Sequence, residues 1–346
     1  MSIFDLIESQ QIAAYWDELS QDREPYACEE LFPNDKKTGL DLKWIKGSKG
    51  LPVVLNNSAF DARAIPRKRI GFSRLSAQMP FFKESKYVDE ELRQELNMVL
   101  ESGNRAYIDT IVGRIFDDET ELLDSAAASR ERMRMMALTA GVVAMSSNGQ
   151  TYVYDYQIPS DHKSNVAVSW SDYENSNPIE DIRAAKEKIL DDTGVTITRA
   201  MCDGKTWRKI RNNKSIKESI FVLSNGVGNV SDRKLREYIM DELEIEVLVN
   251  DKRYADENGN PTKFMPEDTF VLIPPGELGK TWFGITPEES DLLTSNVANV
   301  SIVDTGVAIT SMKQTDPVNV ETKVTMVCLP SFEQADHVYI LSTVTE

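Results

Sequence analysis

The pattern of apolar and polar positions in residues 117–149 predicts one long amphipathic helix. Asp118 is the expected N-cap, Glu121 stands three residues on as in a capping box, and Asn148-Gly149 is the expected stop. At ~1.5 Å per residue the helix would be about 45 Å long, so we interpret it as a spine across which other elements lie. Its expected buried stripe repeats every three or four residues: Leu122, Ala126, Ser129, Met133, Met136, Ala140 and Val143. Its first turns carry five acids, which suit the positive end of a helix dipole: Asp117, Asp118, Glu119, Glu121 and Asp124.

Strand-like alternation follows the predicted spine helix. Residues 150–159 place Tyr152, Tyr154 and Tyr156 on one face, as a half-buried strand does. Two more alternating segments, 318–329 and 338–344, lie near the C-terminus and are expected to rejoin the sheet that begins at Gln150.

The N-terminal part of the chain has little apolar patterning. Residues 1–38 show weak helical periodicity between 11 and 19 and are then polar, so we expect either an arm that becomes ordered on a neighbouring subunit or a frayed terminus. Residues 40–46 and 53–55 are predicted short strands that open a two-stranded excursion. Residues 79–87 return the chain, 88–102 predict a helix that ends at Gly103, and a second helix from Asn104 leads to the spine.

The excursion is basic in an otherwise acidic chain. Between residues 51 and 80, five basic residues stand against one acid, Asp61. We expect this loop to dock on an acidic neighbour, and a solvated basic loop is the alternative. The five basic residues are Arg63, Arg67, Lys68, Arg69 and Arg74.

Residues 178–273 alternate between helical and strand patterns, which predicts a separate compact α/β or α+β domain. Helices are expected at 179–192, 205–212 and 233–243, and strands at 195–201, 220–223, 245–249 and 269–273. Asn177, Pro178 and Gly194 delimit the first helix, Ser231 is the N-cap of the third, and Asn258-Gly259 predicts a hairpin. Residues 274–289 are expected to be irregular.

Composition narrows the functional classes. The 346 residues carry a net charge of −17, which argues against a nucleic-acid reader with a basic face but suits a protein that encloses nucleic acid without gripping it. No apolar run approaches the ~20 residues of a membrane span, and the N-terminus lacks the features of a secretory signal. Cys28, Cys202 and Cys328 are scattered, so we expect three buried thiols and neither disulfides nor a CxxC metal site.

A search for catalytic chemistry finds no constellation. His162 and His337 are the only histidines, and no HExxH, GxSxG or P-loop motif occurs. We therefore expect no catalytic, metal or cofactor-binding residues. Arg130 and Arg134 lie one helical turn apart and repel unless carboxylates lie over them, which indicates a packed or intersubunit face.

The order of these parts resembles the major capsid proteins of tailed bacteriophages, and in detail the lambda-type capsid protein E family. The resemblance rests on dispersed segments and covers most of the chain from about residue 40. These are LTAGVVAM (138–145) with the following SSNGQTYVYDYQIP, residues 170–181, YADENGNPTKFMPEDTFVL (254–272), and ETKVTMVCLPSFEQADHVYILSTV (321–344).

The resemblance implies an α+β capsid fold of the Hong-Kong-phage type. Residues 1–50 would be the N-terminal arm, 51–82 the E-loop, 83–160 the peripheral domain with the spine helix, 161–317 the axial domain, and 318–346 strands returning to the peripheral or axial sheet. Copies would form hexamers and pentamers of an icosahedral head around double-stranded DNA. The expected partners are further copies of the chain, a separate scaffolding protein, a portal and, in some relatives, a decoration protein. Assembly would take place in the bacterial host cytoplasm, and the mature location would be the virion.

Within that fold we expect the five basic residues of the excursion to dock on the acids at the start of a neighbour's spine helix, with Arg130 and Arg134 as further contact residues. Two alternatives stay open. A soluble α+β enzyme or binding protein would form a small defined particle, whereas a tail or tube protein would form open rings or tubes.

Overall fold

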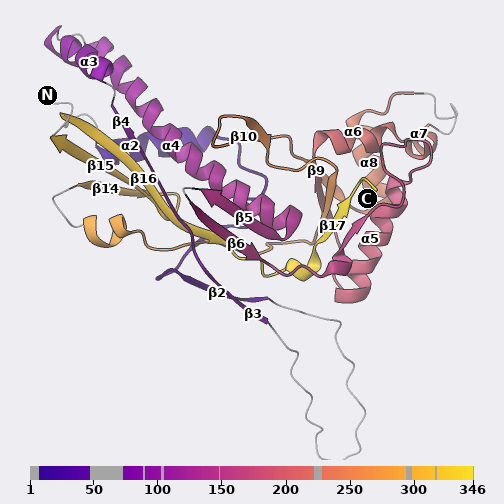
Figure 1. Cartoon of the computed structure of the whole chain (residues 1–346). Helices are drawn as coiled ribbons and strands as arrows, with labels where there is room; N and C mark the ends of the chain where they lie inside the picture. The colour runs from indigo at the N-terminus through magenta and orange to yellow at the C-terminus, as the bar shows by residue number, and fades with distance from the viewer. Residues whose placement is uncertain are drawn as a thin grey trace, which may run out of the picture. The chain divides into compact units, whose positions relative to one another are not determined.

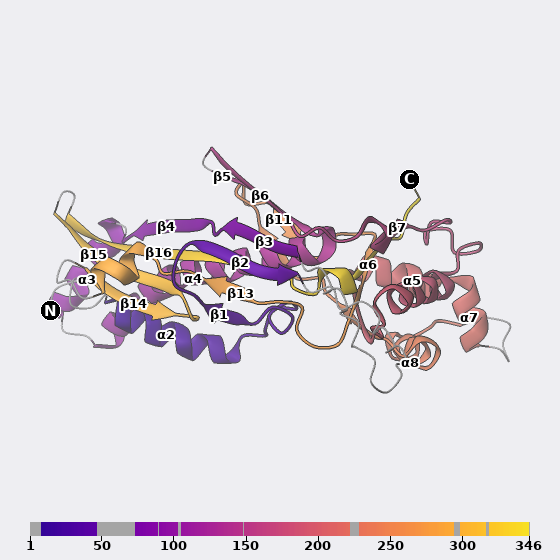
Figure 2. The same cartoon turned by 90° about the horizontal axis from the view of Figure 1, so that it is seen from below.

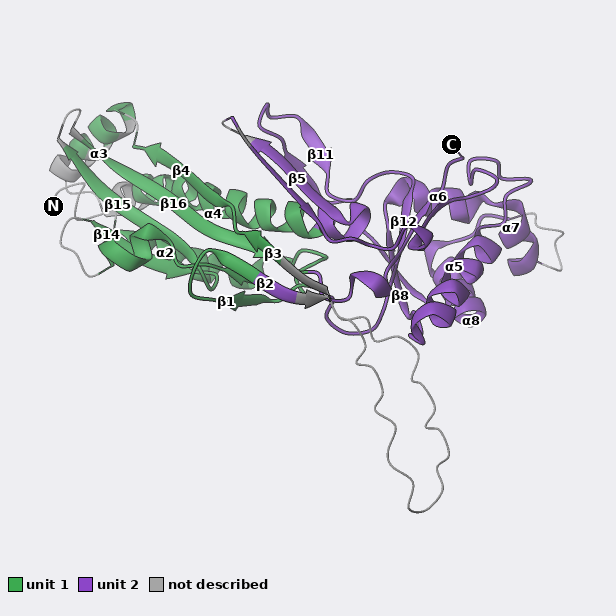
Figure 3. Cartoon of the chain, turned by 60° about the horizontal axis from the view of Figure 1, so that its bottom comes forward, with its two compact units in different colours: residues 1–42, 76–134, 280–331 green, residues 43–75, 135–279, 332–346 purple. Residues whose placement is uncertain are grey.

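The chain folds into two compact units, each assembled from three stretches of sequence (Figure 3). Unit 1 comprises residues 1–42, 76–134 and 280–331, and unit 2 comprises residues 43–75, 135–279 and 332–346. The predicted strand 53–55 and the basic excursion up to residue 72 lie outside the described residues. The computed structural model describes residues 8–46, 73–88, 90–102, 105–147, 149–221, 228–293, 298–315 and 318–345.

The predicted spine helix is present as α4 (Arg105–Ala140), but both of its expected ends were wrong (Figure 1). Asp118 is no N-cap, because the helix expected from Asn104 runs into the spine without a break. At ~1.5 Å per residue its 36 residues span about 54 Å. The helix ends at Gly141, which has φ +72° and donates its N–H to the Ala137 carbonyl at 3.0 Å. Gly149 instead lies in the turn between β5 (Val142–Ser147) and β6 (Gln150–Asp155).

Replacing Gly141 by alanine should lower the free energy of unfolding by about 1–3 kcal/mol, because the position is left-handed and crowded. A Cβ there would lie 2.7 Å from Ile158 Cδ1. Gly113→Ala is the matched control, since Gly113 lies inside α4 with no heavy atom within 4 Å of the added Cβ. That control should raise stability by about 0.5–1 kcal/mol in a denaturant titration. If both substitutions changed the free energy of unfolding in the same direction, this explanation of the helix end would be contradicted.

The sheet of unit 1 is organised around β16 (Val318–Pro330), which pairs antiparallel with three other strands. Its partners are β15 (Val307–Thr315) on one side, and β4 (Phe81–Tyr87) and β13 (Thr281–Phe283) on the other. The prediction that 318–329 rejoins the strand at Gln150 was therefore wrong, because β6 pairs with β5. Residues 274–289 are not wholly irregular, since they contain β13. The order is β1 (Asn34–Lys36), β13, β16, β15, β14 (Asn299–Val303).

The N-terminal segment packs within its own unit. Helix α2 (Ser9–Asp22) lies against β14 and β15, as Figure 2 shows for β14. Ile12 and Trp16 are buried on the face toward these strands, and Trp16 Nε1 donates to Asp304 Oδ1 at 3.4 Å. The expectation that residues 1–38 order on a neighbouring subunit was thus wrong for α2 and for β1. Ile12 and Trp16 are spaced i, i+4, which gives this helix a buried stripe of its own.

Several predicted elements of unit 1 and of the excursion are confirmed. The returning strand is β4, and the amphipathic helix is α3 (Glu90–Ser102). The predicted strand 40–46 is present as β2 (Asp41–Lys46). It pairs with β3 (Ser73–Gln78), which was not among the predicted strands.

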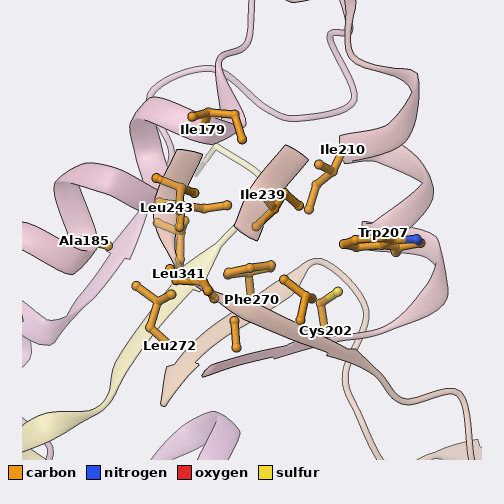
Figure 4. Close-up of a cluster of buried hydrophobic side chains, with 14 of the residues drawn as sticks. Ile179, Ala185, Cys202, Trp207, Ile210, Ile239, Leu243, Phe270, Leu272 and Leu341 are labelled. Atoms are coloured by element: carbon orange, nitrogen blue, oxygen red, sulfur yellow. The ribbon is translucent and has the colours of Figure 1, made fainter. Parts of the chain in front are cut away.

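Unit 2 is a five-stranded sheet packed against helices, as the alternation in sequence predicted. The sheet order is β7 (Lys163–Asn165), β17 (Tyr339–Ser342), β12 (Thr269–Ile273), β8 (Arg199–Cys202), β9 (Glu246–Val249). Its helices are α5 (Pro178–Thr193), α6 (Gly204–Asn212), α7 (Lys214–Ile220) and α8 (Asp232–Leu243). Figure 4 shows Ile239 and Leu243 of α8 meeting Phe270 of β12 in the core.

The helix signals of unit 2 are confirmed, and two strand predictions were wrong. The Asn177 side chain accepts from Glu180 N–H, and Gly194 has φ +72° at the end of α5. The hairpin of β10 (Arg253–Ala255) and β11 (Pro261–Lys263) turns at Gly259, as expected. However, Ile220 ends α7 rather than opening a strand, and β17 pairs with β12 and β7 rather than with β6.

Candidate assembly surfaces

The acidic start of the spine is an exposed stripe with one buried member. Asp117, Asp118, Glu121 and Asp124 are exposed, at the three-and-four spacing of one helix face. Glu119 lies on the opposite face and is only 2% exposed, and burial raises its pKa to about 7. The structure therefore removes Glu119 from the predicted contact surface and leaves the other four.

The acidic stripe already has some partners within unit 1. Tyr15 donates its hydroxyl to Asp117 Oδ1 at 2.7 Å. Lys86 of β4 forms an ion pair with Glu121 and donates to the Asp118 carbonyl at 3.0 Å. Asp118 and Asp124 form no ion pair among the described residues, so the stripe keeps an unneutralised negative charge for a further basic partner.

Arg130 and Arg134 are packed inside unit 1. Arg130 Nη2 lies 2.6 Å from Asp304 Oδ2, with 4% of its side chain exposed. Arg134 donates from Nη2 to Asn34 Oδ1 at 2.6 Å and from Nε to Thr281 Oγ1 at 2.8 Å, and its Nη1 lies 3.8 Å from Glu131 Oε2. The carboxylates that neutralise Arg130 and Arg134 thus come from the same chain. Of the two expected roles for this helix face, packing within the subunit and contact with another subunit, the structure shows packing within the subunit.

The basic residues predicted to dock on the stripe cannot be placed against it. Arg63, Arg67, Lys68 and Arg69 lie outside the described residues, and Arg74 lies in β3. Their docking stays a prediction.

The histidines and cysteines are structural in this fold. His162 Nε2 lies 3.1 Å from Asp192 Oδ2, and 3% of its side chain is exposed. Lys188 Nζ sits between Asp161 and Asp192, at 2.9 and 2.6 Å, where a cation would otherwise bridge these carboxylates. His337 and all three cysteines are buried, and burial raises the pKa of the Cys28, Cys202 and Cys328 thiols.

Sequence reasoning missed a separation of charge in unit 2. Residues 204–217 hold six basic residues and no acid, and α6 and α7 carry them. Exposed acids instead gather where α8 ends and β9 begins. The sequence alone could have indicated this basic surface, because a run of 14 residues with six bases and no acid is unusual in so acidic a chain.

Comparison with known proteins identifies the family. The profile of the phage major capsid protein E family matches residues 8–343. The chain belongs to the phage major capsid protein E family. No curated protein matches the sequence.

Solved structures agree with this membership. The putative capsid protein of a prophage of E. coli CFT073 superposes with a TM-score of 0.59 at 13% identity, over 97% of this chain and 99% of that one. A phage-related protein from Bordetella bronchiseptica RB50 gives 0.54 at 12% identity, over 97% and 96%. The capsid of cyanophage A-1(L) gives 0.53 at 11% identity, over 93% of each chain. The fold is thus the Hong-Kong-phage-type α+β capsid fold, and the role of the capsid protein E chain is structural. Among the described residues, no helix is both long and apolar enough to cross a membrane.

Proposed function

We propose that the chain assembles into hexamers and pentamers of an icosahedral phage head that encloses double-stranded DNA. Family membership supports the capsid role. The net charge of −17 supports enclosure without tight binding, because an acidic wall repels phosphates and leaves the DNA free to move. A separate scaffolding protein and a portal would take part, in the cytoplasm of the bacterial host. The chain itself performs no catalysis in this role.

The observation that carries this proposal is the exposed acidic stripe on α4. Four acids face outward on one rigid helix, while Lys86 neutralises only Glu121 within the unit. The basic E-loop, residues 51–82, carries five basic residues against one acid, Asp61, and so has a net charge of +4. Docking of one copy's E-loop on the next copy's stripe would link subunits through many modest contacts. The remaining parts would be the arm (1–50), the peripheral domain (83–160), the axial domain (161–317) and the returning strands (318–346).

Reversing three E-loop charges should leave a folded subunit that cannot form shells. The variant is Arg67→Glu, Lys68→Glu and Arg69→Glu, measured by sedimentation and electron microscopy beside wild type. Because the effect is electrostatic, reversing Asp117, Asp118 and Asp124 to lysine in the same chain should restore shells. Arg253→Glu, on the exposed hairpin β10–β11, is the control that should assemble normally. Normal shells from the triple variant would overturn the docking model.

A further inference from the structure

One end of unit 2 presents a basic surface, which we define as Arg208, Lys214, Lys217 and Lys234. Arg208, Lys214 and Lys234 are exposed, and none of the four forms an ion pair among the described residues. One exposed acid of α7, Glu218, follows Lys217. α6, α7 and α8 gather at this end (Figure 1). Trp207 of α6 donates Nε1 to Asp232 of α8 at 3.0 Å, and Lys234 Nζ lies 4.9 Å from the centroid of the Phe221 ring that follows α7.

A groove with an apolar floor and several acids runs along α8 from Arg236 to the C-terminal end of the helix. The groove lies between α8 and β9, holds about 440 Å³, and is lined by Met240, Asp241 and Glu246 among others. Arg236 also lines it, and its guanidinium lies over the Trp207 ring, 5.7 Å from the centroid. Met240 is 44% exposed, and Leu248 on the outer strand β9 is 45% exposed. Asp241, Glu244 and Glu246 are exposed and form no ion pair among the described residues.

These charges run against the dipole of α8. Arg233 and Lys234 lie in its first turn beside Asp232, and Asp241 and Glu242 lie in its last. A helix favours acids at its N-terminus and bases at its C-terminus, by about 0.3–1 kcal/mol each. Arg233 pairs with Glu237, and Glu242 pairs with Arg183, within the unit. Lys234 and Asp241 have no such ion pair among the described residues, and contact with another molecule would explain their positions.

We infer that the basic surface of one copy docks into the acidic groove of the next, joining unit 2 head to tail around a ring. The inference rests on the proposed shell function and names the surfaces that would close its rings. Lys234 of the basic surface and Asp241 of the groove lie seven residues apart on α8, about 10 Å along the helix axis, so each copy can use both surfaces at once. Exposed Met240, together with Ile245 and Val247 in the lining of the groove, supplies the apolar centre, and the acids supply the charged rim that such an interface needs.

A second copy fits these observations better than nucleic acid does. DNA phosphates would pair with the basic surface but would leave the acidic groove and its apolar floor without a partner. A net charge of −17 also repels DNA from the chain as a whole. A second copy satisfies both surfaces at the same time.

A charge-swap experiment tests the ring interface. Lys214→Glu with Lys217→Glu, and separately Asp241→Lys with Glu246→Lys, should each give a folded chain that forms no rings or shells. The fourfold variant with all these reversals should assemble again, because each charged contact is restored with opposite sign. Mixing the two double variants should give rings with an even number of subunits, since unlike chains must alternate.

The control reverses two exposed acids on α5, Glu187→Lys with Asp191→Lys, and should assemble as wild type does. Double variants that assemble normally, a folded fourfold variant that does not assemble, or an equally damaging control would each overturn the inference. So would duplex DNA binding by wild type that is lost only in the Lys214/Lys217 variant, while the Asp241/Glu246 variant still assembles. A wild-type chain that forms no oligomer would overturn the proposed shell function together with this inference. Wild-type shells with any of the contradicting variant results would overturn the ring interface alone.

Discussion

Replacing Arg134 by methionine should lower the free energy of unfolding by about 3–5 kcal/mol, because it leaves a buried carboxylate without its cation. Arg134 is 2% exposed and joins the spine helix to two strands, through Asn34 of β1 and Thr281 of β13. Its nearest carboxylate is Glu131, which is fully buried and also accepts from the Cys28 N–H at 3.1 Å. Methionine keeps most of the volume, so the loss measures the polar contacts and not a cavity.

The pH dependence of this loss separates charge from packing. Burial raises the pKa of Glu131 to about 6. Arg134 lowers this pKa, so without Arg134 the pKa rises further and Glu131 takes up a proton at a higher pH in the variant than in wild type. The cost of removing Arg134 should therefore shrink between pH 8 and pH 5. Urea titrations of the unassembled subunit at both pH values would show this. Arg114→Met, on the exposed face of the same helix, should change stability by less than about 0.5 kcal/mol. Equal losses for Arg114 and Arg134 would contradict the assigned role.

Replacing Glu119 by glutamine should raise the free energy of unfolding at pH 8 by about 3 kcal/mol. Burial raises the pKa of Glu119 from 4.5 to about 7. The folded chain therefore holds this proton more tightly than the unfolded chain does. The contribution of Glu119 to the free energy of unfolding is therefore greatest below pH 4.5. It decreases as the pH rises from 4.5 to 7 and changes no further above pH 7. Glutamine is neutral throughout and avoids that loss.

The difference between variant and wild type isolates Glu119 from the other titrating groups. It should be small at pH 4, grow between pH 4.5 and 7, and stay constant above pH 7. Glu121→Gln, at an exposed position about half a helical turn from Glu119, should show no comparable gain. A Glu119→Gln variant that is less stable than wild type at pH 8 would mean that the buried carboxylate is stabilised by contacts and not penalised by burial.

The elements that could be predicted from sequence are those whose signals are local. The limits of α5 follow from Asn177, Pro178 and Gly194, and the hairpin at Gly259 follows from its turn residues. The end of the spine was missed because Asn148-Gly149 was preferred over Gly141, although both glycines have positive φ. Its start was missed because a capping pattern at Asp118 occurs inside an uninterrupted helix, where it has no free N–H groups to cap.

Elements that depend on distant partners were not predictable in the same way. β16 is buried on both faces from residue 324 to 328 and pairs with residues 81–87, 281–283 and 307–315, so no local pattern names its neighbours. The acidic stripe was correctly found as a cluster, but its geometry was only partly seen. Glu119 lies three, four and seven residues before buried Leu122, Leu123 and Ala126, and this spacing alone places it inward.

The central claim is that the chain builds closed shells by self-association. The most direct test is negative-stain electron microscopy with sedimentation of the purified protein, alone and co-expressed with its neighbouring genes. We predict closed shells, or rings of five and six subunits, under at least the second condition. A monodisperse species of fewer than five 39.0 kDa chains under both conditions would contradict the claim.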